Sequence, residues 1–246
     1  MKLSNKILLI TGVIFLATFS VILIRFKGLV GEVIEYRHGE SRKKLEEMMD
    51  SERVSQQFSI QNFEEVEIGC TGNVSIKRSD QFNVTAIAPE ELIDSAILKI
   101  KKSGNTLEID CPPIDPDLLN DNIEIDISMP NIRELEVNDY ASVYLADFAL
   151  EDLDVQLSGN CELIAKNNVI KNLGLNCFGA AEADLKDSRI QNASVKIFGS
   201  NDVNLTMTGG VLKGSMFGSG KLYYYGEVEN VDVETIGSTK VVKRNR

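Results

Sequence analysis

The sequence predicts an all-β protein, a β-solenoid built from coils of about 20 residues and preceded by one N-terminal transmembrane helix. Three observations predict this fold. A glycine recurs at nearly constant steps along the second half of the chain, short runs alternate apolar and polar residues, and residues 7–24 contain no charge. Alternation with a period of two is typical of half-buried strands, and a regular step of this size is typical of repeat architectures.

The repeat is defined by its glycines. One glycine stands seven places into each unit, at steps of 20, 20, 19 and 19 residues, at Gly159, Gly179, Gly199, Gly218 and Gly237. Two earlier units begin at Leu135, with Ala141 in the glycine slot, and at Val66, with Gly72 there. A glycine that recurs in one slot indicates a turn that is too tight for a Cβ or that needs a positive φ. We therefore predict that Gly72 and the five later glycines are structural turn residues in one column.

Two strands are predicted in each unit. The first and third positions are apolar almost throughout, as in Leu153 and Val155 or in Leu173 and Leu175. Another apolar residue returns four places past the glycine slot, at Leu145, Leu163, Ala183, Val203, Leu222 and Val241. Such a unit cannot bury its own apolar edge, but copies stacked at about 4.8 Å per rung can.

One slot of the repeat holds aromatic residues. Phe178, Phe198 and Phe217 stand immediately before repeat glycines, and Ile236 continues the series. Because identical slots of stacked units lie above one another, we predict that these rings form a stacking ladder. The ladder could lie inside the wall of the solenoid or form a ligand platform on its surface, and we expect the first arrangement.

Residues 1–30 are predicted to anchor the protein in a membrane. The 18 residues 7–24 carry no charge, and a helix of that length spans roughly 27 Å, close to the thickness of a hydrocarbon core. The alternative is a cleaved signal peptide, which has a shorter apolar region and small residues at its cleavage site. Lys2 and Lys6 favour an N-terminus inside the cell, which would place the rest of the chain outside the cytoplasm.

The remainder divides into a stalk and one domain. Residues 31–52 are crowded with charges and are predicted to be a juxtamembrane stalk, and residues 53–246 to be a single exported domain. Residues 82–129 are less periodic. They are expected to form a strand at 82–88, a hairpin at 98–109, a loop rich in Pro and Asp at 111–122 and a strand at 123–129.

Charge and cysteine spacing exclude several function classes. Residues 53–246 carry 18 Lys and Arg against 30 Asp and Glu, and this excess of negative charge repels nucleic-acid phosphates. The four cysteines lack zinc-ligand spacing, and the only histidine, His38, precedes the domain. We predict no nucleic-acid partner, no metal and no cofactor.

The cysteines themselves are expected to remain unpaired. Cys70 and Cys177 share the fifth slot of their units, whereas Cys161 occupies the ninth, so no obvious pair faces itself. We predict four reduced, largely buried thiols that behave as small apolar residues, with Cys111 as the fourth.

The repeated motif resembles a known family. Phe198-Gly-Ser-Asn-Asp-Val203, Phe217-Gly-Ser-Gly-Lys-Leu222 and Ile236-Gly-Ser-Thr-Lys-Val241 resemble the repeats of the putative auto-transporter adhesin head GIN domain, a domain of unknown function frequent in Bacteroidetes. The resemblance covers about residues 53–244. It implies a right-handed parallel β-helix in the cell envelope, and it offers no catalytic residue to carry over. Ala141 and the alanines at 180–181 depart from the Gly or Ser that is usual at the family's turns.

Parallel β-helices also include polysaccharide lyases and hydrolases. These enzymes need carboxylates that converge on one outer strand face. The outward slots here hold one acid in each of the units of Glu136 and Asp154 and a pair of acids, Asp232 and Glu234, near the other end. Acids at the two ends lie too many rungs apart to act together, and no calcium-binding nonapeptide repeat is present.

Two function classes follow. The first is a membrane-anchored, non-catalytic envelope module for binding, adhesion or scaffolding, whose partner is a glycan or an envelope protein. The second, kept as the alternative, is a β-helix enzyme that acts on envelope or extracellular polysaccharide. A groove lined by several carboxylates would favour the enzyme, and flat faces of mixed polarity would favour the binding module.

Overall fold

The structure is a computed structural model that describes residues 47–111 and 122–245. Met48–Arg246 form one compact unit. The predicted membrane anchor at residues 1–30 and most of the predicted stalk at 31–52 lie outside the described residues. Within the described ranges, no helix is long and apolar enough to cross a membrane.

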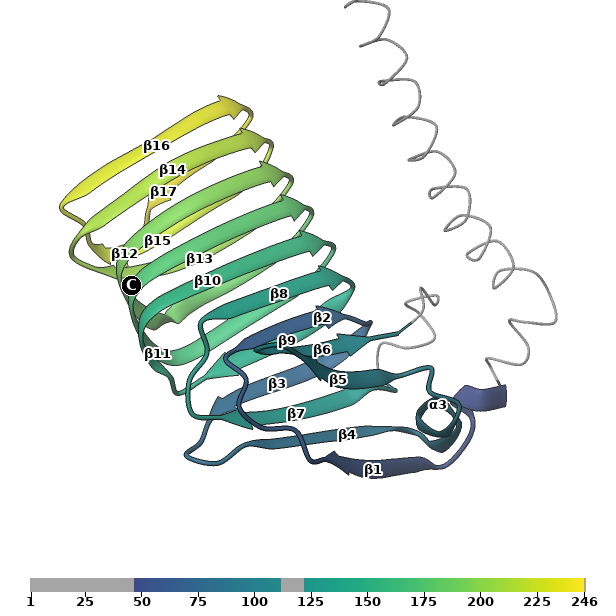
Figure 1. The fold of residues 1–246 in the computed structure, drawn as a ribbon. Helices are drawn as coiled ribbons and strands as arrows, with labels where there is room; N and C mark the ends of the chain where they lie inside the picture. The colour runs from purple at the N-terminus through teal and green to yellow at the C-terminus, as the bar shows by residue number, and fades with distance from the viewer. Residues whose placement is uncertain (1–46, 112–121, 246) are drawn as a thin grey trace, which may run out of the picture. The chain divides into compact units, whose positions relative to one another are not determined.

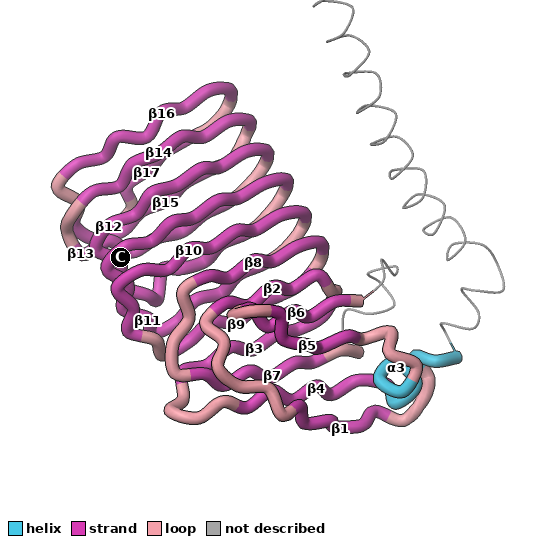
Figure 2. The backbone as a smooth tube through the Cα atoms, viewed as in Figure 1, coloured by secondary structure: helices cyan, strands magenta, loops and turns pink. Residues whose placement is uncertain are grey.

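The described part of the chain is mostly β-strand and forms a solenoid of about five turns (Figures 1 and 2). Its regular array consists of the strands β10 (Ala149–Gly159), β11 (Glu162–Gly179), β12 (Glu182–Gly199), β13 (Asp202–Thr208), β14 (Val211–Gly218), β15 (Lys221–Glu227), β16 (Asn230–Gly237) and β17 (Lys240–Lys243). The preceding part contains β1 (Arg53–Phe58), β2 (Glu65–Gly69), β3 (Gly72–Arg78), β4 (Asn83–Pro89), α3 (Glu90–Asp94), β5 (Lys99–Ser103), β6 (Thr106–Asp110), β7 (Glu124–Met129), β8 (Glu134–Asp139) and β9 (Ala141–Ala146).

Parallel pairing stacks identical slots of successive coils. Leu153 lies beside Leu173, and Leu173 lies beside Ala193. β11 and β12 are long because each runs along both flanks of the solenoid: the first part of β11 pairs with β9 and its last part with β10. One flank therefore has the order β6, β2, β8, β10, β11, β12, β14, β16, and the other has β7, β3, β9, β11, β12, β13, β15, β17. The predicted all-β solenoid is confirmed.

The core lies between the two flanks. Leu153, Val155 and Leu157 alternate with polar residues along β10, and each of these three side chains is at most 1% exposed. Side chains at every second position of a strand point to the same side. Fully burying one such side chain contributes about 1.5–3 kcal/mol, so the stacked apolar columns hold the coils together.

The bends within β11 and β12 bury polar side chains that satisfy the backbone there. Asn168 is 1% exposed; its Nδ2 donates to the Leu145 carbonyl oxygen at 2.9 Å, and its Oδ1 accepts from the Phe148 amide at 3.0 Å. One coil later Ser188, equally buried, donates from Oγ to the Ala165 carbonyl oxygen at 3.0 Å. These side chains replace the strand hydrogen bonds that the bends interrupt.

The register of the first units differs from the predicted one. Gly159 pairs with Asp139, not with Ala141, so the step to the preceding coil is 20 residues rather than 18. Gly72 pairs with Ala141 as predicted. The next residue, Ser142, pairs with Glu162, so Ala141 lies two positions beyond the slot of Gly159. The prediction that Gly72 shares the column of the later glycines is therefore wrong. Gly72 lies in a neighbouring column. Its φ is +152°, and a Cβ added to it would lie 2.8 Å from the carbonyl oxygen of Ile123.

The spatial order of the first rungs differs from their order in the sequence. The predicted strands at 82–88 and 123–129 are confirmed as β4 and β7, and the predicted hairpin is confirmed as antiparallel β5 and β6. β2 lies between β6 and β8, and β3 lies between β7 and β9. In sequence, the rung of β2 and β3 comes first. The rung of β6 and β7 comes next and pairs with one side of it, and the rung of β8 and β9 follows and pairs with its other side.

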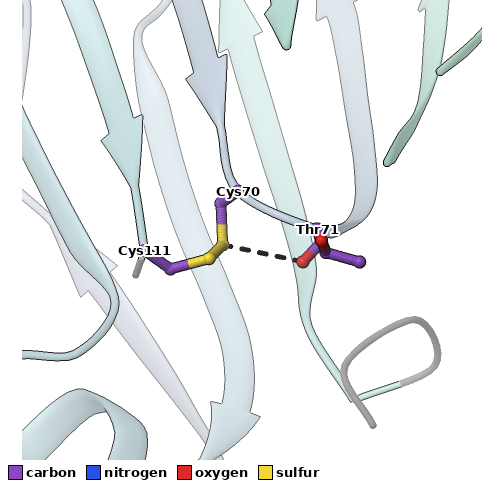
Figure 3. The surroundings of a disulfide bond; sticks show 3 residues. All are labelled: Cys70, Thr71 and Cys111. Atoms are coloured by element: carbon purple, nitrogen blue, oxygen red, sulfur yellow. Dashed lines mark hydrogen bonds between the residues drawn. A yellow bond between two sulfur atoms is a disulfide. The ribbon is translucent and has the colours of Figure 1, made fainter. Parts of the chain in front are cut away.

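This arrangement brings two cysteines together. Cys70 follows β2 and Cys111 follows β6, and the two residues form a disulfide with a Cα–Cα distance of 4.9 Å (Figure 3). The prediction of four reduced thiols is wrong for this pair, because it gave Cys111 no slot in the repeat, whereas β6 pairs with β2. Cys161 and Cys177 are buried and are not part of a disulfide.

Candidate functional site

The repeat glycines form a tight turn at one corner of the solenoid. Gly159, Gly179, Gly199, Gly218 and Gly237 have φ between +100° and +121°, a region that residues with a Cβ rarely adopt. In the turns from Gly179 onward the residue after the glycine donates its amide hydrogen to the glycine carbonyl of the preceding coil, as Ser200 does to Gly179 at 2.8 Å. This close approach leaves no room for a side chain: a Cβ on Gly179 would lie 2.8 Å from the Gly159 oxygen.

The aromatic ladder lies on the outer surface beside this turn. Phe178, Phe198 and Phe217 pair directly across β11, β12 and β14, and their rings stack with centroid distances of 5.6 and 6.1 Å. Their exposed fractions are 39, 41 and 49%, and that of Ile236 on β16 is 54%. The expectation of a stack inside the wall is therefore wrong. Cys177 points inward, and the alternation of the strand turns Phe178 outward.

We call this region the ladder corner: the four ladder side chains, the glycines that follow them, and Ser200, Ser219 and Ser238. The serines stand on the far side of the glycine column and are exposed, and the Oγ atoms of Ser200 and Ser219 are hydrogen-bonded at 2.8 Å. On the other side of the ladder runs a polar outward column, namely Asn176, Lys196, Ser215 and Glu234. From Phe198 onward each rung thus presents one apolar side chain between polar ones, whereas Ala180 follows the glycine on the rung of Phe178.

Charge is distributed unevenly along the solenoid. Residues 53–192 contain 25 Asp and Glu against 11 Lys and Arg, whereas residues 193–246 contain 5 against 7. Most of the ladder therefore lies in the part of the domain that is close to neutral. The strongly acidic part lies at the other end of the stack.

A column of glutamates stacks on the first rungs. Glu67 pairs with Glu108 on one side and with Glu136 on the other. Partial desolvation raises the pKa of Glu67, and the negative charges of Glu136, Glu108 and Asp110 raise it further. Lys101 donates to Glu108 at 2.7 Å and lowers the pKa of that carboxyl.

These acids do not line either of two hollows on the described surface. The hollows on the described surface include two half-open ones, of about 300 and 290 Å³. Glu64 is the only carboxylate that lines the first, and Glu151 is the only one that lines the second. Neither includes Glu67 or its neighbours. Across residues 47–111 and 122–245, no three His, Cys, Asp or Glu side chains are placed to hold a metal ion.

A comparison with protein families assigns the chain to one of them. A family model described as "Putative auto-transporter adhesin, head GIN domain" matches residues 62–228, which include Phe178, Phe198 and Phe217. The chain belongs to this family. The description of the head GIN domain as adhesin-type indicates a protein of the cell surface or envelope.

Solved structures share the fold of this head GIN chain. A putative adhesin from Bacteroides fragilis is similar with a TM-score of 0.59 and 14% identity, over 80% of this chain and 99% of that chain. A putative lipid binding protein from Parabacteroides distasonis is similar with a TM-score of 0.50 and 17% identity, over 79% of this chain and 98% of that chain. At these identities the likeness shows the fold alone. No curated protein matches the chain.

Proposed function

We propose that the protein is a non-catalytic binding module of the cell envelope. Residues 7–24 hold it in a membrane, residues 53–246 lie outside the cytoplasm, and the ladder corner binds the partner. The observation that carries the proposal is the exposure of apolar side chains on four successive rungs, at Phe178, Phe198, Phe217 and Ile236. Contiguous apolar surface costs solubility, and such a patch rimmed by polar residues is typical of an interaction site.

The disulfide supports the location. Disulfides form and persist in oxidising compartments and are rare in the cytosol. The Cys70–Cys111 bond is largely buried, with exposed fractions of 2 and 8%, so it is built into the first rungs rather than added at the surface. A domain that folds around this bond fits an exported position.

The binding module is favoured over the polysaccharide enzyme by the shape of the surface. Glycoside hydrolysis needs two carboxylates facing each other across a bound sugar. Glu67 and its neighbours instead stand side by side along one sheet flank, and Lys101 pairs with Glu108. The family and the similar structures are described as adhesins or as lipid binding, which is consistent with binding without catalysis.

Retention by cell envelopes tests the proposal. The full chain, solubilised in mild detergent, is mixed with envelope fragments from cells that lack it, and the bound fraction is measured by sedimentation. The wild-type chain should be retained, and Phe198→Ser with Phe217→Ser should reduce retention on the order of tenfold or more, because buried aromatic anchors dominate such contacts.

Val169→Ser is the matched control, since Val169 is an exposed apolar residue (42%) outside the ladder corner. Its retention should equal that of the wild type. Equal retention of the double phenylalanine variant would remove the ladder corner from the proposal.

A further inference from the structure

We propose that the ladder corner binds an uncharged, linear β-1,4-linked polysaccharide that lies along the solenoid axis with one sugar on each rung. The inference rests on the proposed function, because it assigns a ligand class to the same surface. It follows from the spacing, the chemistry and the charge of the corner.

The spacing of the corner matches that of such a polymer. Strands in a sheet repeat at about 4.8 Å, and the ladder rings repeat at 5.6 and 6.1 Å. An extended β-1,4-linked glycan advances with every sugar by a distance between the strand repeat and the ring repeat. A polymer with this repeat stays in register over the four rungs from Phe178 to Ile236, so that each rung offers it one exposed apolar side chain. A helical α-1,4-linked glycan has no such straight repeat.

The chemistry of a rung such as that of Phe198 matches that of one sugar. A pyranose ring has an apolar face of C–H bonds and a rim of hydroxyl groups. Phe198 offers an apolar ring, and Ser200, two residues later across the glycine turn, offers a hydroxyl. On the other side Lys196 stands in the polar column. The ladder rings stack on one another, so their faces are turned toward neighbouring rings and a polymer outside the ladder meets their apolar edges. These edges can pack against the C–H face of a sugar, and polar side chains on both sides can meet the hydroxyl rim.

The charge of the corner selects an uncharged polymer. Beside the ladder, Lys196 and Lys213 are balanced by Asp232 and Glu234 on the last rung of this flank. The acidic rungs at residues 53–192 repel polymers that carry carboxylates or phosphates. A neutral glycan meets neither a net attraction nor a net repulsion along the corner.

A second copy of the chain fits the corner less well. The ladder is one side chain wide, and the glycines next to it add no side-chain surface. Stable protein interfaces bury about 1,200–2,000 Å² in total, which a narrow stripe does not supply. A thin polymer needs no wider surface than this stripe.

Co-sedimentation with insoluble polysaccharides tests the assignment. The full chain in mild detergent is mixed with cellulose or chitin, both β-1,4-linked and largely uncharged, and with starch granules, which are α-1,4-linked. We expect binding to cellulose or chitin, at least tenfold less binding to starch, and a tenfold or greater loss with Phe198→Ser. Val169→Ser should leave binding unchanged.

A gain-of-binding variant guards against misfolding as the cause of a loss. Ser158 precedes Phe178 in the ladder column, so Ser158→Phe extends the ladder by one rung and should tighten binding several-fold. Equal binding to starch, or no change in both ladder variants, overturns the assignment. Absence of binding to cellulose and chitin, with retention by cell envelopes intact, overturns the ligand class and leaves the proposed function standing. Loss of envelope retention as well would overturn both.

Discussion

Gly199→Val is expected to lower the melting temperature of the domain more than any surface substitution. Gly199 has a φ of +111°, and an added Cβ would overlap the carbonyl oxygen of Gly179, which already accepts the Ser200 amide at 2.8 Å. The backbone conformation costs about 1–3 kcal/mol for a β-branched residue, and forcing extra atoms into a packed site costs about 1–3 kcal/mol more. For a domain of this size the melting temperature should fall by roughly 5–20 °C.

The damage should be local, because each rung is supported mainly by the rungs beside it. Limited proteolysis of Gly199→Val should therefore cleave first within residues 193–230. Lys196→Ala is the control, since this exposed side chain stands on the same strand, three residues before Gly199. If Gly199→Val melts at the same temperature as Lys196→Ala, the glycine column is not a structural turn.

Removal of the disulfide is expected to have an effect of similar size. The Cys70–Cys111 bond closes a loop with a sequence separation of 41. Restricting a loop of that length in the unfolded chain stabilises the folded state by about 4 kcal/mol in the chain-entropy description, and losing a native disulfide typically costs about 2–5 kcal/mol. Cys70→Ser with Cys111→Ser should lower the melting temperature by roughly 5–15 °C.

Reductant provides the matched control. It should lower the melting temperature of the wild type and leave that of the double serine variant unchanged. Alkylation of the unfolded, non-reduced chain, followed by mass spectrometry, should modify Cys161 and Cys177 only. Modification of all four cysteines in protein taken from cells would restore the original expectation of reduced thiols.

The regular coils could be predicted from the sequence because their slots repeat. From Leu153 onward the predicted columns match the observed pairing, including the glycine column from Gly159 to Gly237. The coil of Leu135 was misplaced by two residues. A slip of two leaves every side chain on its original face, so the apolar pattern cannot distinguish the two registers.

The ladder's position could have been predicted from the same alternation. Leu173, Leu175 and Cys177 form an inward series, which places Phe178 outward. Aromatic character alone favours burial, but the alternation of inward and outward positions along the strand decides whether an apolar side chain is exposed. Exposed apolar side chains on four rungs are typical of an interaction site.

The first rungs could not be predicted from local patterns, because the pairing of β6 with β2 joins distant segments. One signal was present in the sequence. Val66-Glu-Ile-Gly-Cys70 and Leu107-Glu-Ile-Asp-Cys111 share their alternation, their glutamate and their cysteine. Treated as two copies of one slot series, they place both cysteines in the same column and predict the disulfide.

The most direct test of the account is whether the ladder corner faces the outside of the cell. Ser219→Cys introduces a thiol at an exposed position of that corner. The native chain provides a low background, because Cys70 and Cys111 are bonded, Cys161 is buried, and burial, with Cys161 nearby, raises the pKa of Cys177 to about 12. In spheroplasts, a membrane-impermeant maleimide should label the full-length Ser219→Cys chain as completely as it does after lysis. Labelling that occurs only after lysis would place the domain in the cytoplasm and contradict the account.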